Sequence, residues 1–237
     1  MYLQDELERL AEMRAIDSDE GVANSLMRVA IAYLDKGKYD LAAEPLDEAY
    51  YLCRKLENHA GRAQVCLRLA DVATAGERFD QAREHLAEAE EVFAAQDDLA
   101  GLAGVAERRG RLELKAGDPA GAARAWEEAQ AMVRRADDQV GELLLTQYLA
   151  GVYRQMGRHD QALEAYRNLG RLADQAGDPQ RVALALVGMA TLLAAMGRRD
   201  PARQAFEQAE AVYRELGQVQ RAEQVKQEME RLLSADQ

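Results

Sequence analysis

Hydrophobic and polar positions along this chain follow a helical spacing that restarts every forty residues. The segments align without a gap when they begin at residues 21, 61, 101, 141 and 181. In each segment, a first run of apolar positions is spaced i, i+3, i+4, i+7, which is typical of one buried helix face. A second such run follows after a short break. The pattern therefore predicts two helices per segment, the first from about position 2 to position 15.

Three positions of the segment indicate how these helices pack. Position 22 is alanine in every copy: Ala42, Ala82, Ala122, Ala162 and Ala202. Four residues later a large apolar residue follows: Leu46, Leu86, Trp126, Tyr166 and Phe206. Position 10 is small throughout: Ala30, Ala70, Gly110, Ala150 and Ala190. Small residues let two helices approach closely, and we expect the large residue to fill the space between them.

The break between the two runs predicts a tight turn. Four copies carry glycine there: Gly37, Gly117, Gly157 and Gly197. The second copy carries Gly76, one position earlier. Glycine permits the left-handed backbone that ends a helix. We expect the aspartates that follow to cap the second helix: Asp40, Asp80, Asp160 and Asp200. Pro45 lies inside one second helix, which it should kink or loosen.

A single helical hairpin cannot bury its apolar face, so successive hairpins must stack into a solenoid. Residues 1–20, with a helix over 3–14, and residues 221–237, with a helix over 221–233, are expected to cap the two ends. The fold class is therefore all-α, with five hairpin repeats (21–60, 61–100, 101–140, 141–180, 181–220) in one continuous domain over 1–237. Strand-like alternation of apolar and polar residues is missing from the sequence.

The charge and the cysteines narrow the classes of protein. A net charge of −12 and a pI near 4.9 argue against nucleic-acid binding and favour solubility. Cys53 and Cys66 fall at apolar positions, where free cysteine acts as a small hydrophobe, although a disulfide between them stays open. The N-terminus lacks a signal-peptide pattern, and the longest apolar stretch, 182–196, is too short to span a bilayer. We expect a soluble, cytoplasmic protein without membrane insertion.

Nothing in the sequence indicates catalysis. His59, His85 and His159 fall in different copies and at different positions, so their spacing indicates no metal cluster. No strand precedes a phosphate-binding glycine loop, and the pattern buries both cysteines away from a histidine partner. We therefore expect neither an enzyme nor a bound metal or cofactor.

The repeated positions resemble the tetratricopeptide repeat family, whose pattern is W-x2-L-G-x2-Y followed by A-x3-F and P. The fourth copy reads Thr146-x2-Leu149-Ala150-x2-Tyr153 and then Ala162-x3-Tyr166. The copies here are forty residues long rather than about thirty-four, and the final proline is missing, so the chain is similar to the longer-repeat members, such as Pins-type adaptors and kinesin light chains. The resemblance implies a right-handed superhelix whose inner groove, lined by first helices, holds a partner peptide or helix.

The groove positions that the resemblance implies differ between the two halves of the chain. In the first three copies they are mostly polar: Asn24, Arg28, Gln64, Arg68, Arg108 and Arg111. Arg28, Arg68 and Arg108 share one position of the segment, which suggests an acceptor strip for an acidic peptide or a C-terminal carboxylate. The alternative is that they pair across helices with Asp71 and Glu107 or face solvent. The family's carboxylate clamp is not reproduced, since the sequence has Met27 and Ile31 there.

In the last two copies the groove positions are largely apolar: Leu144, Tyr148, Leu184 and Val187. Such a strip suits the apolar face of a partner helix, or it is covered by the C-terminal helix or by a second copy of the chain. Arg109 and Glu113 occupy positions that are mostly apolar elsewhere, and their i, i+4 spacing suggests that they pair with each other.

These observations favour a protein–protein interaction scaffold whose partner is a protein or peptide, acidic, amphipathic or both. A self-assembling structural protein, including a weak homodimer, and a regulator that senses a small peptide are the alternatives.

Overall fold

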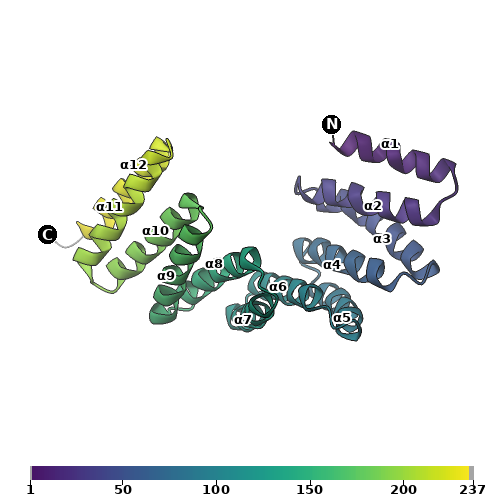
Figure 1. Ribbon diagram of the computed structural model, residues 1–237. Helices are drawn as coiled ribbons and strands as arrows, with labels where there is room; N and C mark the ends of the chain where they lie inside the picture. Colours follow the sequence, from purple (N-terminus) through teal and green to yellow (C-terminus); the bar gives the residue numbers. More distant parts are fainter. Residues whose placement is uncertain (1, 235–237) are drawn as a thin grey trace. The chain divides into compact units, whose positions relative to one another are not determined.

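The computed structural model describes residues 2–234, and in that range every regular element is an α-helix (Figure 1). The twelve helices are α1 (Tyr2–Ala15), α2 (Asp19–Leu34), α3 (Tyr39–Lys55), α4 (His59–Ala75), α5 (Phe79–Ala95), α6 (Leu99–Lys115), α7 (Pro119–Arg135), α8 (Gln139–Gln155), α9 (His159–Gln175), α10 (Pro179–Ala195), α11 (Arg199–Glu215) and α12 (Val219–Leu233). The all-α class and the stacked helical hairpins are confirmed. None of these helices is long and apolar enough to cross a bilayer.

The forty-residue segment is built from two nearly equal halves. From α3 to α11 every helix has 17 residues, and three residues connect it to the next helix. The first helix of each segment begins earlier than expected: α4, for example, starts at His59, before its segment begins at residue 61. The real unit of the chain is therefore a helix and a turn, repeated about every twenty residues. α3 continues through Pro45 to Lys55.

The same turn joins helices within a segment and between segments. At Gly37, Gly117, Gly157 and Gly197 the φ angles are 66°, 87°, 68° and 72°, as expected for glycines that end a helix. The expectation was wrong for Gly76, because the left-handed residue of that turn is Glu77, with φ 60°. In each turn the next backbone N–H bonds a carbonyl five residues back, as Lys38 does to Tyr33 at 2.9 Å. Backbone hydrogen bonds of the turn thus terminate each helix, without a side chain as acceptor.

The expected caps of the second helices were also wrong. Asp40 lies in the first turn of α3, whose N-cap is Lys38 and has no side-chain cap bond; α5, α9 and α11 begin in the same way. Side-chain caps instead begin all five first helices of the segments: Ser18, Asn58, Asp98, Asp138 and Asp178 each accept the N–H three residues later. Among the second helices, α7 has the same bond, from the Gly121 N–H to Asp118. Each satisfies a donor that the helix would otherwise leave open.

The helices form two compact units, one up to residue 132 and one from residue 133 onward. From α1 to α6, and again from α8 to α12, each helix contacts the next one in sequence, and first helices also touch one another, as α4 does α6 and α10 does α12. Stacking of this kind buries the apolar face that a lone hairpin exposes. The single continuous domain over 1–237 stays a prediction.

The small and large positions of the repeat meet as expected. All five alanines of position 22 are fully buried, and the large residues after them are at most 7% exposed. The closest approach is at Gly110 of α6, where an added Cβ would lie 2.2 Å from Nε1 of Trp126. Trp126 also donates from Nε1 to the Glu107 carbonyl at 3.1 Å. Gly110 is therefore required by the ring that fills the space between α6 and α7.

Candidate partner-binding site

Three arginines of the first unit gather on one carboxylate. The carboxylate of Asp71 on α4 accepts from Nη2 of Arg111 at 2.8 Å and from Nε of Arg108 at 3.2 Å, and Nη1 of Arg68 lies 3.7 Å away. Glu107 adds a second carboxylate, 3.0 Å from Nε of Arg111. α4 and α6 thus bring three of the predicted residues together at Asp71. Arg108 and Arg111 pair with it across helices, as the sequence left open as an alternative, and Arg68 pairs with it within α4.

Lys115 extends this cluster to the end of α4. Its Nζ donates to the carbonyls of Thr74 and Ala75, at 3.0 and 2.6 Å. An open cavity of about 320 Å³ lies here, lined by Tyr39, Asp71, Thr74, Ala75, Arg108, Arg111 and Lys115. We call Arg68, Arg108, Arg111 and Lys115, with Asp71 and Glu107, the cationic cluster.

The cationic cluster keeps a positive charge in an acidic chain. Its four cations face two carboxylates, and the exposed carboxylate of Asp35 adds an attraction to Arg68. Burial, and then the neighbouring Arg108, lower the pKa of Arg68, while burial raises the pKa of Glu107. Both directions reflect charged groups held partly away from water. At least one positive charge is in excess, at a site where screening by solvent is reduced.

The other predicted residues of the first unit do not join the cluster. Arg28 lies 3.8 Å from Glu6 of α1, which is itself buried. Asn24 and Gln64 are exposed on α2 and α4. The expected strip of three equivalent arginines is therefore replaced by a cluster centred on Asp71.

Arg109 and Glu113 do not pair with each other, contrary to expectation. Arg109 pairs with Glu90 of α5 and, at 3.5 Å, with Glu128 of α7, and Glu113 pairs with Arg83 of α5 at 3.1 Å. The two polar residues of α6 thus tie neighbouring helices together, which accounts for their place in an otherwise apolar pattern.

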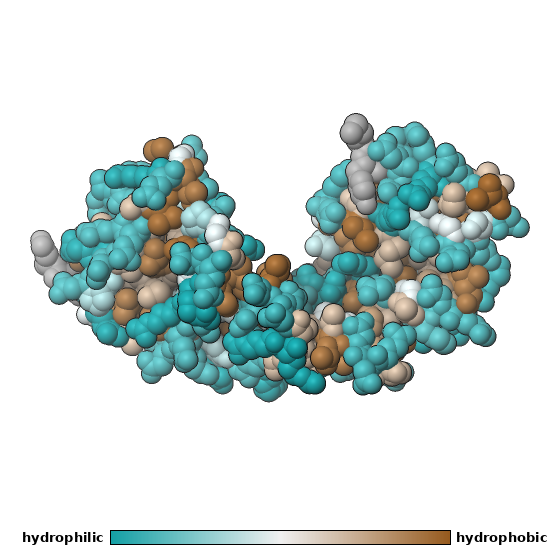
Figure 2. Space-filling view, in the orientation of Figure 1, coloured by the Kyte–Doolittle hydropathy of each residue, from teal (hydrophilic) through white to brown (hydrophobic). Residues whose placement is uncertain are grey.

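In the second unit the predicted apolar residues have different surroundings. Leu144 and Tyr148 are half-buried on α8, and Val187 packs on the core cluster that α10, α11 and α12 share. Leu184 of α10 is 39% exposed. Figure 2 shows hydrophobic residues over the α10–α12 part of this unit. The C-terminal helix thus covers part of the strip, as one alternative held, while Leu184 stays open to solvent.

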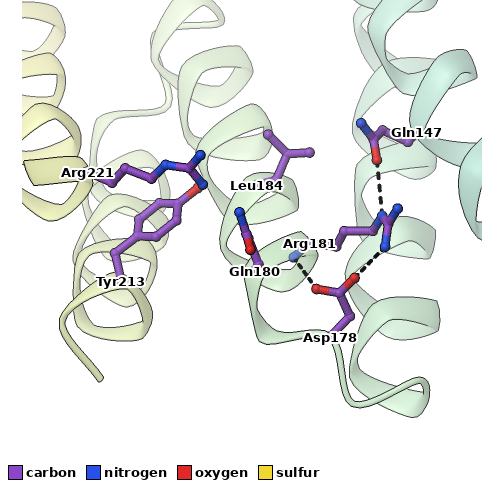
Figure 3. Close-up of a pocket in the computed structure, with 7 residues that line it drawn as sticks. All are labelled: Gln147, Asp178, Gln180, Arg181, Leu184, Tyr213 and Arg221. Carbon is purple, nitrogen blue, oxygen red and sulfur yellow. Dashed lines mark hydrogen bonds and ion pairs between the residues drawn. The ribbon is translucent and has the colours of Figure 1, made fainter. Parts of the chain in front are cut away.

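Leu184 lies in an open cavity of about 430 Å³, lined also by Gln147, Asp178, Gln180, Arg181, Tyr213 and Arg221 (Figure 3). We call it the α10 cavity. Arg181 pairs with Asp178 and donates from Nε to the Gln147 amide oxygen at 3.4 Å. The N–H of Arg181 bonds the Asp178 carboxylate and, as the largest cause, lowers its pKa.

Arg221 lines the opposite side of the α10 cavity. Its guanidinium carbon lies 5.9 Å from the centroid of the Tyr213 ring, a cation–π contact. Arg181 and Arg221 were not predicted from the sequence, although the sequence carries a signal for them. Both occupy the first position of the segment, which is glycine in the four earlier copies: Gly21, Gly61, Gly101 and Gly141.

Among residues 2–234, no group of three or more histidine, cysteine, aspartate or glutamate side chains could hold a metal ion. Both cysteines are free and buried. Burial raises the pKa of Cys66 to about 12, so its thiol is protonated at neutral pH.

A family model described as tetratricopeptide repeat matches residues 21–95 and 142–215, which is more than half of the chain. No curated protein matches it. One similar solved structure is a signal transduction ATPase with numerous domains from Pyrococcus horikoshii, which has a tetratricopeptide repeat sensor. Its TM-score is 0.77 at 16% sequence identity, and the match covers 87% of this chain and 32% of that one. This chain therefore spans less than a third of that protein.

Two further structures are matched over most of their length. A Rap protein complexed with Competence and Sporulation Factor has a TM-score of 0.66 at 16% identity, over 99% of this chain and 74% of that one. Repeats of a putative kinesin light chain from Podosopora anserina have a TM-score of 0.65 at 20% identity, over 82% of this chain and 96% of that one. At such identities these likenesses show the fold.

Proposed function

Because the chain belongs to the tetratricopeptide repeat family, we propose that it is a non-catalytic interaction scaffold that binds an acidic segment of a partner protein. The site that we propose is the cationic cluster of α4 and α6. The observation that carries the proposal is the gathering of four cations beside an open cavity, in a chain whose net charge is −12.

The cationic cluster suits a carboxylate for a geometric reason. Asp71 and Glu107 each hold guanidinium groups in place, so less side-chain freedom is lost when a ligand binds. A guanidinium has five N–H donors, so an arginine that already has a partner can still bind a second carboxylate. Arg111, with 43% of its side chain exposed, is the most accessible arginine of the three. Arg111 and Lys115 would therefore make the first contacts with the partner.

The solved structures offer a precedent for binding by such hairpins. The Rap structure is a complex with Competence and Sporulation Factor, and the Pyrococcus horikoshii protein is described as having a repeat sensor. The second candidate function, sensing of a short signal, thus has support from the fold. It differs from the scaffold in requiring that the ligand change the conformation of the chain.

Fluorescence anisotropy with the full chain tests the proposed site. The probe is a labelled glutamate-rich peptide with blocked ends, and the reference peptide has glutamine at each glutamate. The double variant Arg111→Gln, Lys115→Gln should weaken binding of the probe by about tenfold or more, because both charges contact the partner. The control is Arg124→Gln, an arginine of α7 with 72% of its side chain exposed, which should bind like the unmodified chain.

Thermal melting first establishes that both variants are folded. If the double variant bound the glutamate peptide as well as the control does, or if the glutamine peptide bound equally well, the cationic cluster would not be the site.

A further inference from the structure

The α10 cavity differs in chemistry from the cationic cluster. In Figure 3 Gln180 and Leu184 of α10 lie between two arginines, with Arg221 beside Tyr213 on one side and Arg181 beside Gln147 on the other. A ligand lying across α10 would therefore meet an apolar side chain, amide groups and guanidinium groups in one cavity.

The two arginines have different charge environments. The charge of Arg181 is balanced by Asp178, whose carboxylate also caps α10. Among residues 2–234 Arg221 forms no ion pair, and its contact is with the face of the Tyr213 ring. A guanidinium that stacks on a ring keeps its planar edge available for a carboxylate. Arg221 is thus the open cation of the α10 cavity.

The repeat pattern marks both arginines as a local departure. Four earlier copies have glycine at this position, which is the third residue of the helix. Arginine at two consecutive copies places long cationic side chains where the first unit has none. Departures from a repeat that lack a packing role are often functional. Arg221 is exposed, and apart from its contact with the Tyr213 ring its guanidinium is open to solvent.

The amides and the leucine add the remaining chemistry. Gln147 and Gln180 each carry both donor and acceptor groups, which can pair with the backbone of an extended peptide. Leu184 is a large aliphatic side chain that is open to the cavity. An aliphatic side chain of the ligand would be removed from water against it.

We propose that the α10 cavity binds an extended segment of a partner protein in which an acidic residue lies close to an aliphatic residue. The acidic side chain pairs with Arg221, the aliphatic side chain packs on Leu184, and the segment's backbone bonds Gln180 and Gln147. This inference rests on the proposed scaffold function only in treating hairpin faces as binding surfaces; it concerns different helices and different residues.

Amide chemical shifts of the full chain, recorded during titration with a short peptide, test the proposal. The probe has blocked ends and contains one glutamate and one leucine two positions apart, among serine and alanine. Shift changes should be concentrated at Gln180, Arg181, Leu184 and Arg221. Peptides with glutamine for the glutamate, or serine for the leucine, should bind about tenfold more weakly.

Variants of the chain give the matching test. Arg221→Gln should weaken binding about tenfold and remove the difference between the glutamate and glutamine peptides, and Leu184→Ser should remove the difference between the leucine and serine peptides. Arg203→Gln, an exposed arginine of α11, is the control and should bind normally. Since Arg221 and Arg203 are exposed, both variants should fold, which thermal melting checks.

Three results would overturn the proposal. The first is that no amide shifts change at millimolar peptide. The second is that Arg221→Gln and Arg203→Gln bind the peptide equally well. The third is that sedimentation equilibrium shows a dimer of the chain that Arg221→Gln dissociates, because a second copy would then occupy the cavity. The glutamate-rich peptide, titrated into the same samples, separates this proposal from the proposed function, because its binding depends on Arg111 and Lys115.

Discussion

Substitution of Gly110 by alanine tests how the helices of a hairpin pack. An added Cβ would lie 2.2 Å from Nε1 of Trp126, a distance that real Cβ atoms do not show. Because Trp126 is fully buried and bonds the Glu107 carbonyl, the ring cannot move without losing packing or that bond. Gly104, in the same helix, is the matched control, since the nearest atom to its added Cβ is 3.6 Å away.

The magnitude follows from the difference between these two sites. Both substitutions gain the same helix propensity, about 1 kcal/mol for alanine over glycine, so this gain cancels in the comparison. Overpacking at Gly110 should cost roughly 1–3 kcal/mol, and the lost tryptophan hydrogen bond about 1 kcal/mol. Gly110→Ala should therefore be less stable than Gly104→Ala by roughly 2–4 kcal/mol.

Urea denaturation followed by tryptophan fluorescence measures this difference, because Trp126 is the sole tryptophan of the chain and reports on the site itself. In a Trp126→Leu background, followed by circular dichroism, the cost of Gly110→Ala should shrink, as expected when two residues are in contact. Equal stability of the two alanine variants, or an unchanged cost without the ring, would refute the packing argument.

Three further predictions concern caps, pH and thiols. Asp138→Ala removes the acceptor for the Gly141 N–H and should lower the free energy of unfolding by about 1 kcal/mol in a chemical melt; no loss would mean that the cap is replaced by water. The pKa of Asp178 is lowered, so its bonds to Arg181 stabilise the fold above about pH 4, and this stabilisation is lost as the pH falls through the lowered pKa. Asp178→Asn should therefore destabilise the fold at pH 7 and have no effect in acid. An equal effect at both pH values would contradict this. Native Cys66, whose thiol pKa is raised to about 12, should resist iodoacetamide until urea unfolds the chain, as mass spectrometry would show; rapid native labelling would contradict its burial.

The helical repeat could be predicted because its physics is local. Spacing of apolar residues and the alanine of position 22 depend on the period of a helix, so the hairpins and the C-terminal ends of their first helices emerge from the sequence. The caps were misassigned because aspartate occurs near both helix starts. Asp98 and Asp138 lie three residues before a glycine, a spacing that marks a true cap here, whereas Asp40 lies two residues after the N-cap, inside the first turn of α3.

The candidate sites were less predictable because they depend on distances between helices. The sequence brings Arg28, Arg68 and Arg108 to one repeat position, but which carboxylate each arginine meets depends on side-chain reach across the stack. Asp71 pairs with Arg68 and Arg108, whereas Arg28 pairs with Glu6. The α10 cavity could have been suspected from arginine at a glycine position, although its amides could not.

The most direct test of the scaffold account is a crystal structure of the full chain with the glutamate-rich peptide bound. The account predicts a peptide carboxylate within hydrogen-bond distance of Arg111 and Lys115, with Asp71 still bonded to Arg108. A peptide seated away from α4 and α6, with those two side chains in contact with protein and solvent alone, would contradict it.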